Sequence, residues 1–269
     1  MSFLTLDNIS HYYFTKSSFT KVLDNVYFKV DEGEIVAVLG QRSCGKSTLL
    51  SILSGIIHPT EGKILLNRKP LNHSERTIGC MLQKDYLFPW KSIMDNVLLG
   101  PKISGHLSDK TRQAASDLLC DVGVPDIGDK YPASLSDEIR QRVALVRTLM
   151  TDPKIILLDE PFSSLDYQAN VKLEDLISKM LKARHKTTLL ATHDIGEAIA
   201  LSDRIIVMDA KPGSVAKIFN VPIELREERP ILVRRHPKYL LLFDKIWEIL
   251  ESKEISFTEA KVVQPYEGN

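Results

Sequence analysis

The sequence lacks paired cysteines, long apolar runs and an excess of charge of either sign. Its three cysteines, Cys44, Cys80 and Cys120, are far apart and form no CxxC pair, which indicates free thiols in a reducing compartment. No run of about 18 apolar residues and no apolar leader occurs, so we expect a cytosolic chain that does not span a membrane by itself. Because 35 Lys and Arg balance 35 Asp and Glu, the charge gives no sign of a nucleic-acid partner.

A phosphate-binding loop is the clearest motif that is present. The segment GQRSCGKST has the spacing G-x-x-x-x-G-K-S, with the apolar run Ile35–Leu39 before it and a helical pattern after it. Backbone N–H groups and the helix N-terminus of such a loop bind phosphate. We expect Lys46 to contact the β- and γ-phosphates and the Ser47 hydroxyl to ligate Mg²⁺. The residues predicted to bind nucleotide here are Gly40, Gln41, Arg42, Ser43, Cys44, Gly45, Lys46, Ser47 and Thr48.

Strand patterns alternate with helical patterns along most of the chain. Strands are expected at residues 3–6, 22–30, 35–39, 63–67, 78–82, 154–160, 187–192 and 204–208, and helices at 49–55, 93–120, 136–150 and 167–184. This alternation predicts an α/β fold with a mainly parallel sheet covered on both faces. Ligands of such sheets lie beyond the carboxyl ends of the strands, where Gly40, Gln83, Asp159 and His193 are all expected.

Two further features fit a nucleotide site. The apolar strand 154–160 ends in Asp159 and Glu160, and an apolar strand ending in Asp is the expected second half of such a site. Tyr12 and Tyr13 are candidates to stack on adenine, although they could also be ordinary strand aromatics.

The last part of the chain has a different character. A charged run over 226–235 is followed by an amphipathic pattern over 237–250. We expect this tail to pack on the core, because a separate domain of that size would be marginally stable.

Six separated motifs resemble, in order and spacing, those of the ATP-binding subunits of ABC transporters. They are GQRSCGKST, Gln83, LSDEIRQR (135–142), IILLDEP (155–161), SSLD (163–166) and ATHD (191–194). The resemblance runs from about residue 3 to 220 and implies a P-loop NTPase fold with an antiparallel β subdomain and a helical subdomain at about 86–150. Residues 221–269 would then be a C-terminal helical extension. The segment 87–90 and the tail look like the branch that imports nitrate, sulfonate, taurine or bicarbonate.

The resemblance implies a role for each motif residue. Tyr13 would stack on adenine, Ser47 and Gln83 would ligate Mg²⁺, and Asp159 would orient the metal through water. The implied catalytic set is Glu160, His193, Gln83 and Lys46.

Some of these roles join two subunits. Glu160 would polarise the attacking water, while His193 would contact the γ-phosphate and bridge to Asp166 of a second subunit. Ser136, in the signature motif, would approach the ATP held by the opposite subunit. Without the resemblance, Glu160 could be a turn cap and His193 a structural histidine.

The implied partners are transmembrane permease subunits, a second ATPase subunit and, indirectly, a solute-binding protein, at the cytoplasmic face of the membrane. The segment after Gln83 would face the permease, and exposed Leu87, Phe88 and Trp90 would suit docking. Burial of these three side chains in the helical subdomain is an equal alternative. Soluble ABC ATPases that act on DNA or ribosomes are disfavoured by the single nucleotide domain and the neutral charge.

The signature motif departs from the family pattern LSGGQ, in which glycines let the backbone approach the γ-phosphate. Asp137 and Glu138 occupy those positions. Two unit charges 4 Å apart repel by about 4 kcal/mol at an effective dielectric constant of about 20, so these acids should weaken closure on ATP. Arg42 and Ser43 form a second, milder departure. We therefore predict an importer ATPase with a degenerate signature site; the alternative is an ATP-sensing or non-hydrolysing subunit of a heterodimer.

Overall fold

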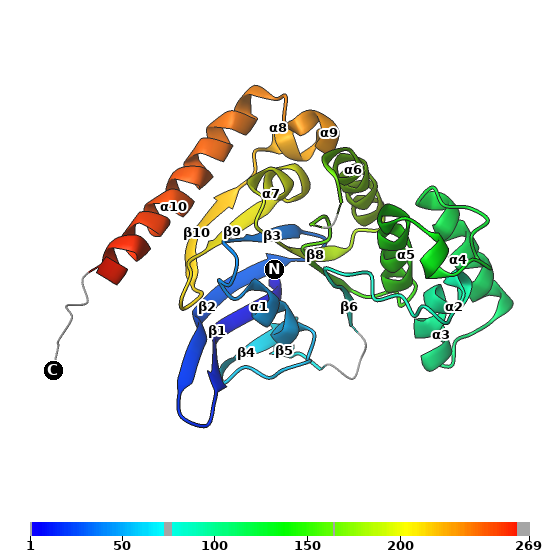
Figure 1. Cartoon of the computed structure of the whole chain (residues 1–269), viewed down its shortest axis with the longest axis horizontal. Coiled ribbons are helices and arrows are strands. Elements are labelled where there is room, and N and C mark those ends of the chain that lie inside the picture. The colour runs from blue at the N-terminus through cyan, green and yellow to red at the C-terminus, as the bar shows by residue number, and fades with distance from the viewer. Residues whose placement is uncertain (1, 73–76, 164, 263–269) are drawn as a thin grey trace.

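The computed structural model describes residues 2–72, 77–163 and 165–262 and consists of two sheets, a group of helices and a long C-terminal helix (Figure 1). Ser164 of the SSLD motif and residues 263–269 of the predicted extension lie outside the described residues. Over these ranges no helix combines the length and the apolar character needed to cross a bilayer.

One sheet is antiparallel and the other is mainly parallel, which confirms the predicted fold class. The antiparallel sheet has the order β2-β1-β4-β5, with β1 (Ser2–Phe14), β2 (Phe19–Asp31), β4 (Glu61–Leu66) and β5 (Lys69–Pro70). The second has the order β10-β9-β3-β8-β7-β6, with β3 (Ile35–Leu39), β6 (Ile78–Met81), β7 (Ile155–Asp159), β8 (Thr187–Thr192), β9 (Arg204–Met208) and β10 (Val215–Asn220). Within it only β10, at one edge, pairs antiparallel.

The central strand β3 shows why the parallel strands read as continuous apolar runs. All of its residues are buried. Val36 and Val38 join the core cluster that contains α1 (Lys46–Leu53), whereas Ala37 and Leu39 join the cluster that contains α7 (Ile195–Leu201). Because successive side chains of a strand point to opposite faces, α1 and α7 cover the two faces of this sheet.

Four helices lie together on one side of the molecule (Figure 1). They are α2 (Ile93–Val97), α3 (Leu99–Ile103), α4 (Asp109–Asp121) and α5 (Asp137–Leu149). The pattern at 93–120 thus forms three helices, and α4 begins at the expected cap, since the Thr111 N–H donates to Ser108 Oγ at 3.2 Å. The division of the chain at residue 220 and the limits of the helical subdomain stay predictions.

The C-terminal segment packs against α7, as expected from its amphipathic pattern. It forms α8 (Ile223–Arg226), α9 (Pro230–Val233) and α10 (Pro237–Val262), and α10 extends beyond the predicted end at residue 250. Leu225, Val233, Tyr239 and Ile246 are buried in the same apolar cluster as Ile199 of α7.

The helix α7 and the strand β10 are among the elements that were not predicted. α7 is buried along its whole length, so its sequence has no amphipathic period. β10 is an edge strand whose side chains are mostly partly or fully exposed, so no apolar alternation marks it.

Candidate functional site

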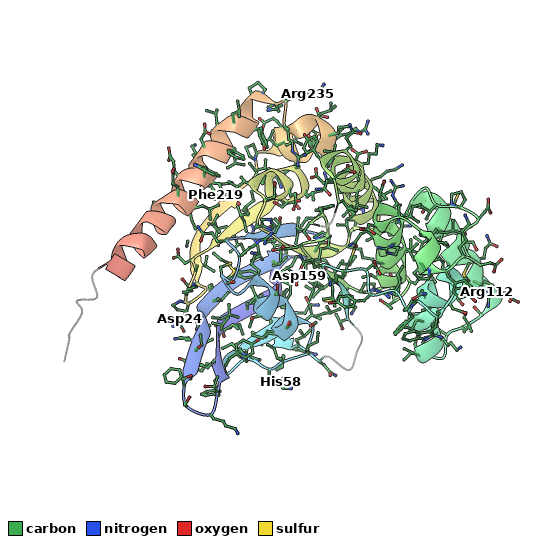
Figure 2. All side chains as sticks on the ribbon, viewed as in Figure 1. Asp24, His58, Arg112, Asp159, Phe219 and Arg235 are labelled. Atoms are coloured by element: carbon green, nitrogen blue, oxygen red, sulfur yellow. The ribbon has the colours of Figure 1, made fainter. Side chains whose placement is uncertain are left out.

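A cavity of about 450 Å³ lies at the end of β3, over the phosphate loop. Its lining residues are Tyr13, Val22, Arg42, Ser43, Gly45, Lys46, Ser47, Thr48, Gln83 and Glu160. The structure therefore brings the loop together with residues from β1, from the end of β6 and from the end of β7. Asp159, which precedes Glu160, lies near the middle of the molecule in Figure 2.

Two glycines shape the phosphate loop. Gly45 precedes α1 with a φ of 100°, and a Cβ there would lie 2.6 Å from Leu23 Cδ2. A Cβ at Gly40 would lie 2.6 Å from the Cys44 sulfur, which is buried beneath the loop. Burial raises the pKa of the Cys44 thiol, so Cys44 packs as a neutral side chain. Gly40 and Cys44 thus support the loop and do not line the cavity.

Lys46 is held by its own loop. Its ammonium donates to Gly40 O at 2.8 Å and to Gln41 O at 3.0 Å, and it lies 3.7 Å from Glu160 Oε1. The side chain is only 4% exposed. A positive charge is therefore fixed beside the loop amides, which is the arrangement that favours a phosphate ligand.

Three oxygen-bearing side chains are candidates for Mg²⁺. Ser47 Oγ donates to Asp159 Oδ1 at 3.3 Å, and the Gln83 amide donates to Ser163 Oγ at 3.1 Å. Burial raises the pKa of Asp159, and the bond from Ser47 partly offsets this. Within the described part of the chain no group of three or more His, Cys, Asp and Glu side chains surrounds a metal position. One hydroxyl, one carboxylate and one amide oxygen fit Mg²⁺, which usually takes its other ligands from water and substrate phosphates.

Glu160 and His193 meet at the ends of two neighbouring strands. β7 and β8 pair in parallel, and Glu160 Oε1 lies 3.3 Å from His193 Nδ1. The Glu160 N–H donates to Ala191 O at 2.9 Å, which fixes the backbone on which its carboxylate stands. The predicted convergence of strand ends therefore places a carboxylate and an imidazole together beside the phosphate loop.

Ser136 and Asp166 lie outside this cavity. Each caps a helix in the single chain: Ser136 Oγ accepts from Ile139 N at 3.4 Å, and Asp166 Oδ1 accepts from Ala169 N at 2.9 Å at the start of α6 (Tyr167–Ala183). Both side chains therefore bond to the backbone at the starts of helices and do not line the cavity over the phosphate loop.

The two acids of the signature motif are ion-paired. Asp137 pairs with Arg140, and Glu138 pairs with Arg142 on the next turn of α5. Arg140 also donates to Asp85 at 2.9 Å. The sequence analysis did not predict these two ion pairs, although spacings of three and four residues are those of side chains that pair on one helix face.

The segment after Gln83 combines a buried and an exposed part. Leu87 is buried, so the expectation of an exposed Leu87 is wrong and the alternative of a core residue holds for it. The buried Asn96 fixes the segment by accepting from Phe88 N at 2.7 Å and donating to Phe88 O at 3.2 Å. Trp90 is 70% exposed and lies against Phe88 with ring centroids 5.3 Å apart.

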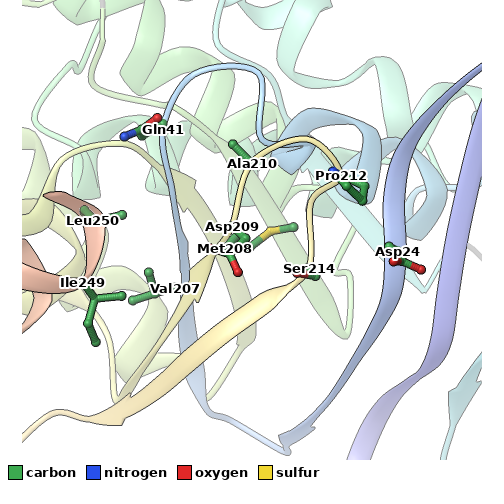
Figure 3. A pocket seen from close by; sticks show the side chains of 10 residues that line it. All are labelled: Asp24, Gln41, Val207, Met208, Asp209, Ala210, Pro212, Ser214, Ile249 and Leu250. Atoms are coloured by element: carbon green, nitrogen blue, oxygen red, sulfur yellow. The ribbon is translucent and has the colours of Figure 1, made fainter. Parts of the chain in front are cut away.

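A second cavity, of about 330 Å³, lies between the turn joining β9 to β10 and the helix α10 (Figure 3). Gln41 borders this cavity, with Ile249 and Leu250 of α10 on another side. The Gln41 side chain is thus not part of the nucleotide cavity. Its backbone oxygen still contributes to the loop by accepting from Lys46.

Comparison with known proteins agrees with this geometry. A family model described as ABC transporter matches residues 23–163. The chain is 46% identical over 254 residues to the ABC transporter ATP-binding protein YtlC of Bacillus subtilis, across 94% of this chain and 98% of YtlC. It is 38% identical to the taurine import ATP-binding protein TauB of Ruegeria pomeroyi, across 82% of this chain and 83% of TauB.

A solved structure has the same fold. The dimeric ATP-binding cassette MJ0796, bound to ADP and Pi, matches with a TM-score of 0.72 and 30% identity, over 81% of this chain and 99% of that one. The phosphate loop, the converging strand ends and these matches lead to one conclusion: the chain belongs to the ABC transporter family, as an ATP-binding subunit.

Proposed function

We propose that this chain is the ATPase of an importer for small anions or related solutes of the nitrate, sulfonate, taurine or bicarbonate type. The observation that carries the ATPase part is the single cavity in which Tyr13, Lys46, Ser47, Gln83 and Glu160 meet. The solute class is supported by relatives named as taurine import proteins, which match up to 97% of this chain.

The adenine would lie on Tyr13, which is 46% exposed at the edge of the cavity. The phosphates would lie on the loop amides, where they would replace the loop carbonyls as partners of Lys46. Ser47, Gln83 and Asp159 would hold Mg²⁺, which supplies charge neutralisation of the phosphates when bound.

Glu160 would orient and polarise the attacking water. Its carboxylate is only 15% exposed and has two fixed neighbours, Lys46 at 3.7 Å and His193 at 3.3 Å. His193 would contact the γ-phosphate, so that the same histidine senses both the phosphate and the carboxylate. Such positioning is the main contribution that a protein makes to phosphoryl transfer.

A second subunit would complete the site with Ser136 and Asp166. Asp137 and Glu138 would then face the γ-phosphate of the partner's ATP. Because Arg140 and Arg142 neutralise part of their charge, the repulsion is smaller than that of two bare carboxylates. We propose slow turnover at such a site.

The alternative function is an ATP-sensing subunit that pairs with an ATPase of intact signature. Asp137 and Glu138 favour it, since they occupy the end of α5 that should approach phosphate. The presence of both Glu160 and His193, 3.3 Å apart, favours hydrolysis, because a subunit without turnover has no chemical need for this pair.

Permease subunits would dock beside Gln83 on the exposed ring of Trp90. Isolation of the tagged chain from its native membrane tests this assembly. Hydrophobic subunits and a solute-binding protein should co-purify, whereas recovery with ribosomes or DNA instead would contradict the proposal.

A further inference from the structure

The C-terminal segment packs against both α6 and α7 and so connects them. α9 contacts both helices, and α8 contacts α7, as Figure 1 also shows. Two neighbouring acids of α6 receive arginines from this segment: Asp175 pairs with Arg229 at 2.7 Å, and Glu174 pairs with Arg234.

These two ion pairs differ in burial. Arg229 is 66% exposed in its pair with Asp175, so solvent screens that interaction. Glu174 is only 1% exposed, and Arg234 binds both of its oxygens, at 2.7 and 2.8 Å. Burial alone would lower the pKa of the Arg234 guanidinium, but the bonds to Glu174 raise it above its usual value, so Arg234 stays charged. A buried bidentate pair of this kind fixes geometry as well as charge.

Arg234 also reaches the first turn of α7. A Cβ built on Gly196 would lie 3.0 Å from Asp194 Oδ1, 3.1 Å from the Tyr239 hydroxyl and 3.3 Å from Arg234 Nε. Three polar groups therefore close over Gly196, and two of them come from the C-terminal segment. The positive Arg234 faces the negative Asp194 as well as Glu174.

Asp194 follows His193 directly and controls the start of α7. Its carboxylate accepts from Glu197 N at 2.8 Å, and its own N–H donates to Thr192 Oγ1 at 3.0 Å. The backbone on both sides of His193 is thus held by this network. Because His193 Nδ1 lies 3.3 Å from Glu160, a shift of Asp194 would move the imidazole relative to the cavity.

Glu174 belongs to the helix that begins at Asp166, whose carboxylate caps that helix. Arg234 therefore binds the helix that starts at Asp166 and lies beside the first turn of α7, which follows His193. We propose that Arg234 is a positioning residue, which couples the C-terminal extension to the γ-phosphate contact of His193. This inference rests on the proposed function, since it assumes that His193 contacts the γ-phosphate.

The test compares binding of MgADP with binding of the complex of Mg²⁺ and the non-hydrolysable analogue AMP-PNP, in the full chain. Only AMP-PNP carries a γ-phosphate. The ratio of the dissociation constant for MgADP to that for the AMP-PNP complex therefore reports the contact of His193 with the γ-phosphate, and the measurement requires no turnover. His193→Ala is the reference variant. Arg229→Met is the matched control, because it removes an exposed arginine from the same segment.

Arg234→Met should reduce the ratio by at least about threefold, within the range of measured coupling effects, and toward the value of His193→Ala. Glu174→Met combined with Arg234→Met removes both charges, so it should restore the thermal unfolding temperature. The ratio should stay low in this double variant, because Arg234 then no longer faces Asp194. Arg229→Met should keep the wild-type ratio.

A ratio that returns to the wild-type value together with thermal stability would overturn the proposal and leave Arg234 a purely structural role. An equal loss of ratio in Arg229→Met would overturn it too. If the wild-type chain binds neither nucleotide, the proposed function fails first, and the inference fails with it. The wild type could prefer the AMP-PNP complex over MgADP, with the preference lost in His193→Ala. In that case a wild-type ratio of dissociation constants in both Arg234 variants rejects this inference and leaves the proposed function standing.

Discussion

The Lys46 ammonium lies 3.7 Å from the Glu160 carboxylate and within hydrogen-bonding distance of two carbonyls of its own loop. A nucleotide phosphate must therefore displace contacts that already satisfy Lys46. The same contact holds Glu160 beside the phosphate loop. The pair links the binding residue to the residue proposed to activate water.

Glu160→Gln is expected to stop hydrolysis while leaving nucleotide binding intact. Glutamine keeps the size of the side chain and one acceptor oxygen but cannot accept a proton from water. Loss of a general base lowers a rate by about 100-fold or more. Steady-state phosphate release and equilibrium binding of MgATP measure the two effects. Loss of binding together with hydrolysis would show that Glu160 acts mainly on the fold of the loop.

Replacing Asp137 and Glu138 with glycine is expected to increase turnover by about tenfold, equivalent to about 1.4 kcal/mol. The gain is smaller than that from removing two bare charges, because both acids are ion-paired and Asp137 is 61% exposed. A matched variant, Asp137→Asn with Glu138→Gln, removes charge without adding glycine and separates the two causes. An unchanged rate in folded protein would argue against the degenerate-site proposal.

Ser43→Gly is expected to stabilise the nucleotide-free chain by about 1 kcal/mol or less. Ser43 has a φ of 65°, a left-handed conformation that costs a non-glycine residue about 1–2 kcal/mol, and the greater freedom of glycine in the unfolded chain offsets part of the gain. Urea unfolding gives the change in free energy. The same replacement at Ser54, whose φ is −76°, should lower stability instead. Equal effects at both positions would rule out backbone strain at Ser43.

Glu197 should make the chain less stable as pH rises. Burial raises the pKa of its carboxyl from 4.5 to about 8, with Asp194 and Glu174 also raising it and Arg234 lowering it. Between these values the native state holds a proton that the unfolded state has released. The free energy of unfolding therefore falls with pH from about 4.5 to about 8, by at most about 1.4 kcal/mol per pH unit from this group.

Glu197→Gln removes this titration. The free energy of unfolding of Glu197→Gln, measured with urea, should increasingly exceed that of the wild type as pH rises through this window. Above the window the difference should stay constant. Glu251→Gln, a change at an exposed glutamate of α10, should leave the wild-type pH dependence in place. A difference between wild type and Glu197→Gln that is constant with pH would show that Glu197 is ionised in the folded chain.

The phosphate loop and the meeting of Glu160 with His193 could be predicted because they follow from local rules. A contiguous motif defines the loop, and parallel strands bring their carboxyl ends to one edge. The pair of Glu174 and Arg234 could not be predicted in this way, since it joins residues 60 positions apart. The burial of Leu87 and the turn of Gln41 away from the nucleotide cavity likewise depend on how distant elements pack.

Titration of MgATP into the wild-type chain and into Lys46→Met tests the central claim most directly. Methionine keeps much of the apolar stem of Lys46 but removes the charge that should meet the phosphates. The wild type should bind, and Lys46→Met should bind at least about tenfold more weakly while remaining folded, since charged hydrogen bonds contribute roughly 1.5–3 kcal/mol. Equal affinity of the two proteins, or no binding by the wild type, would contradict a nucleotide site at this loop.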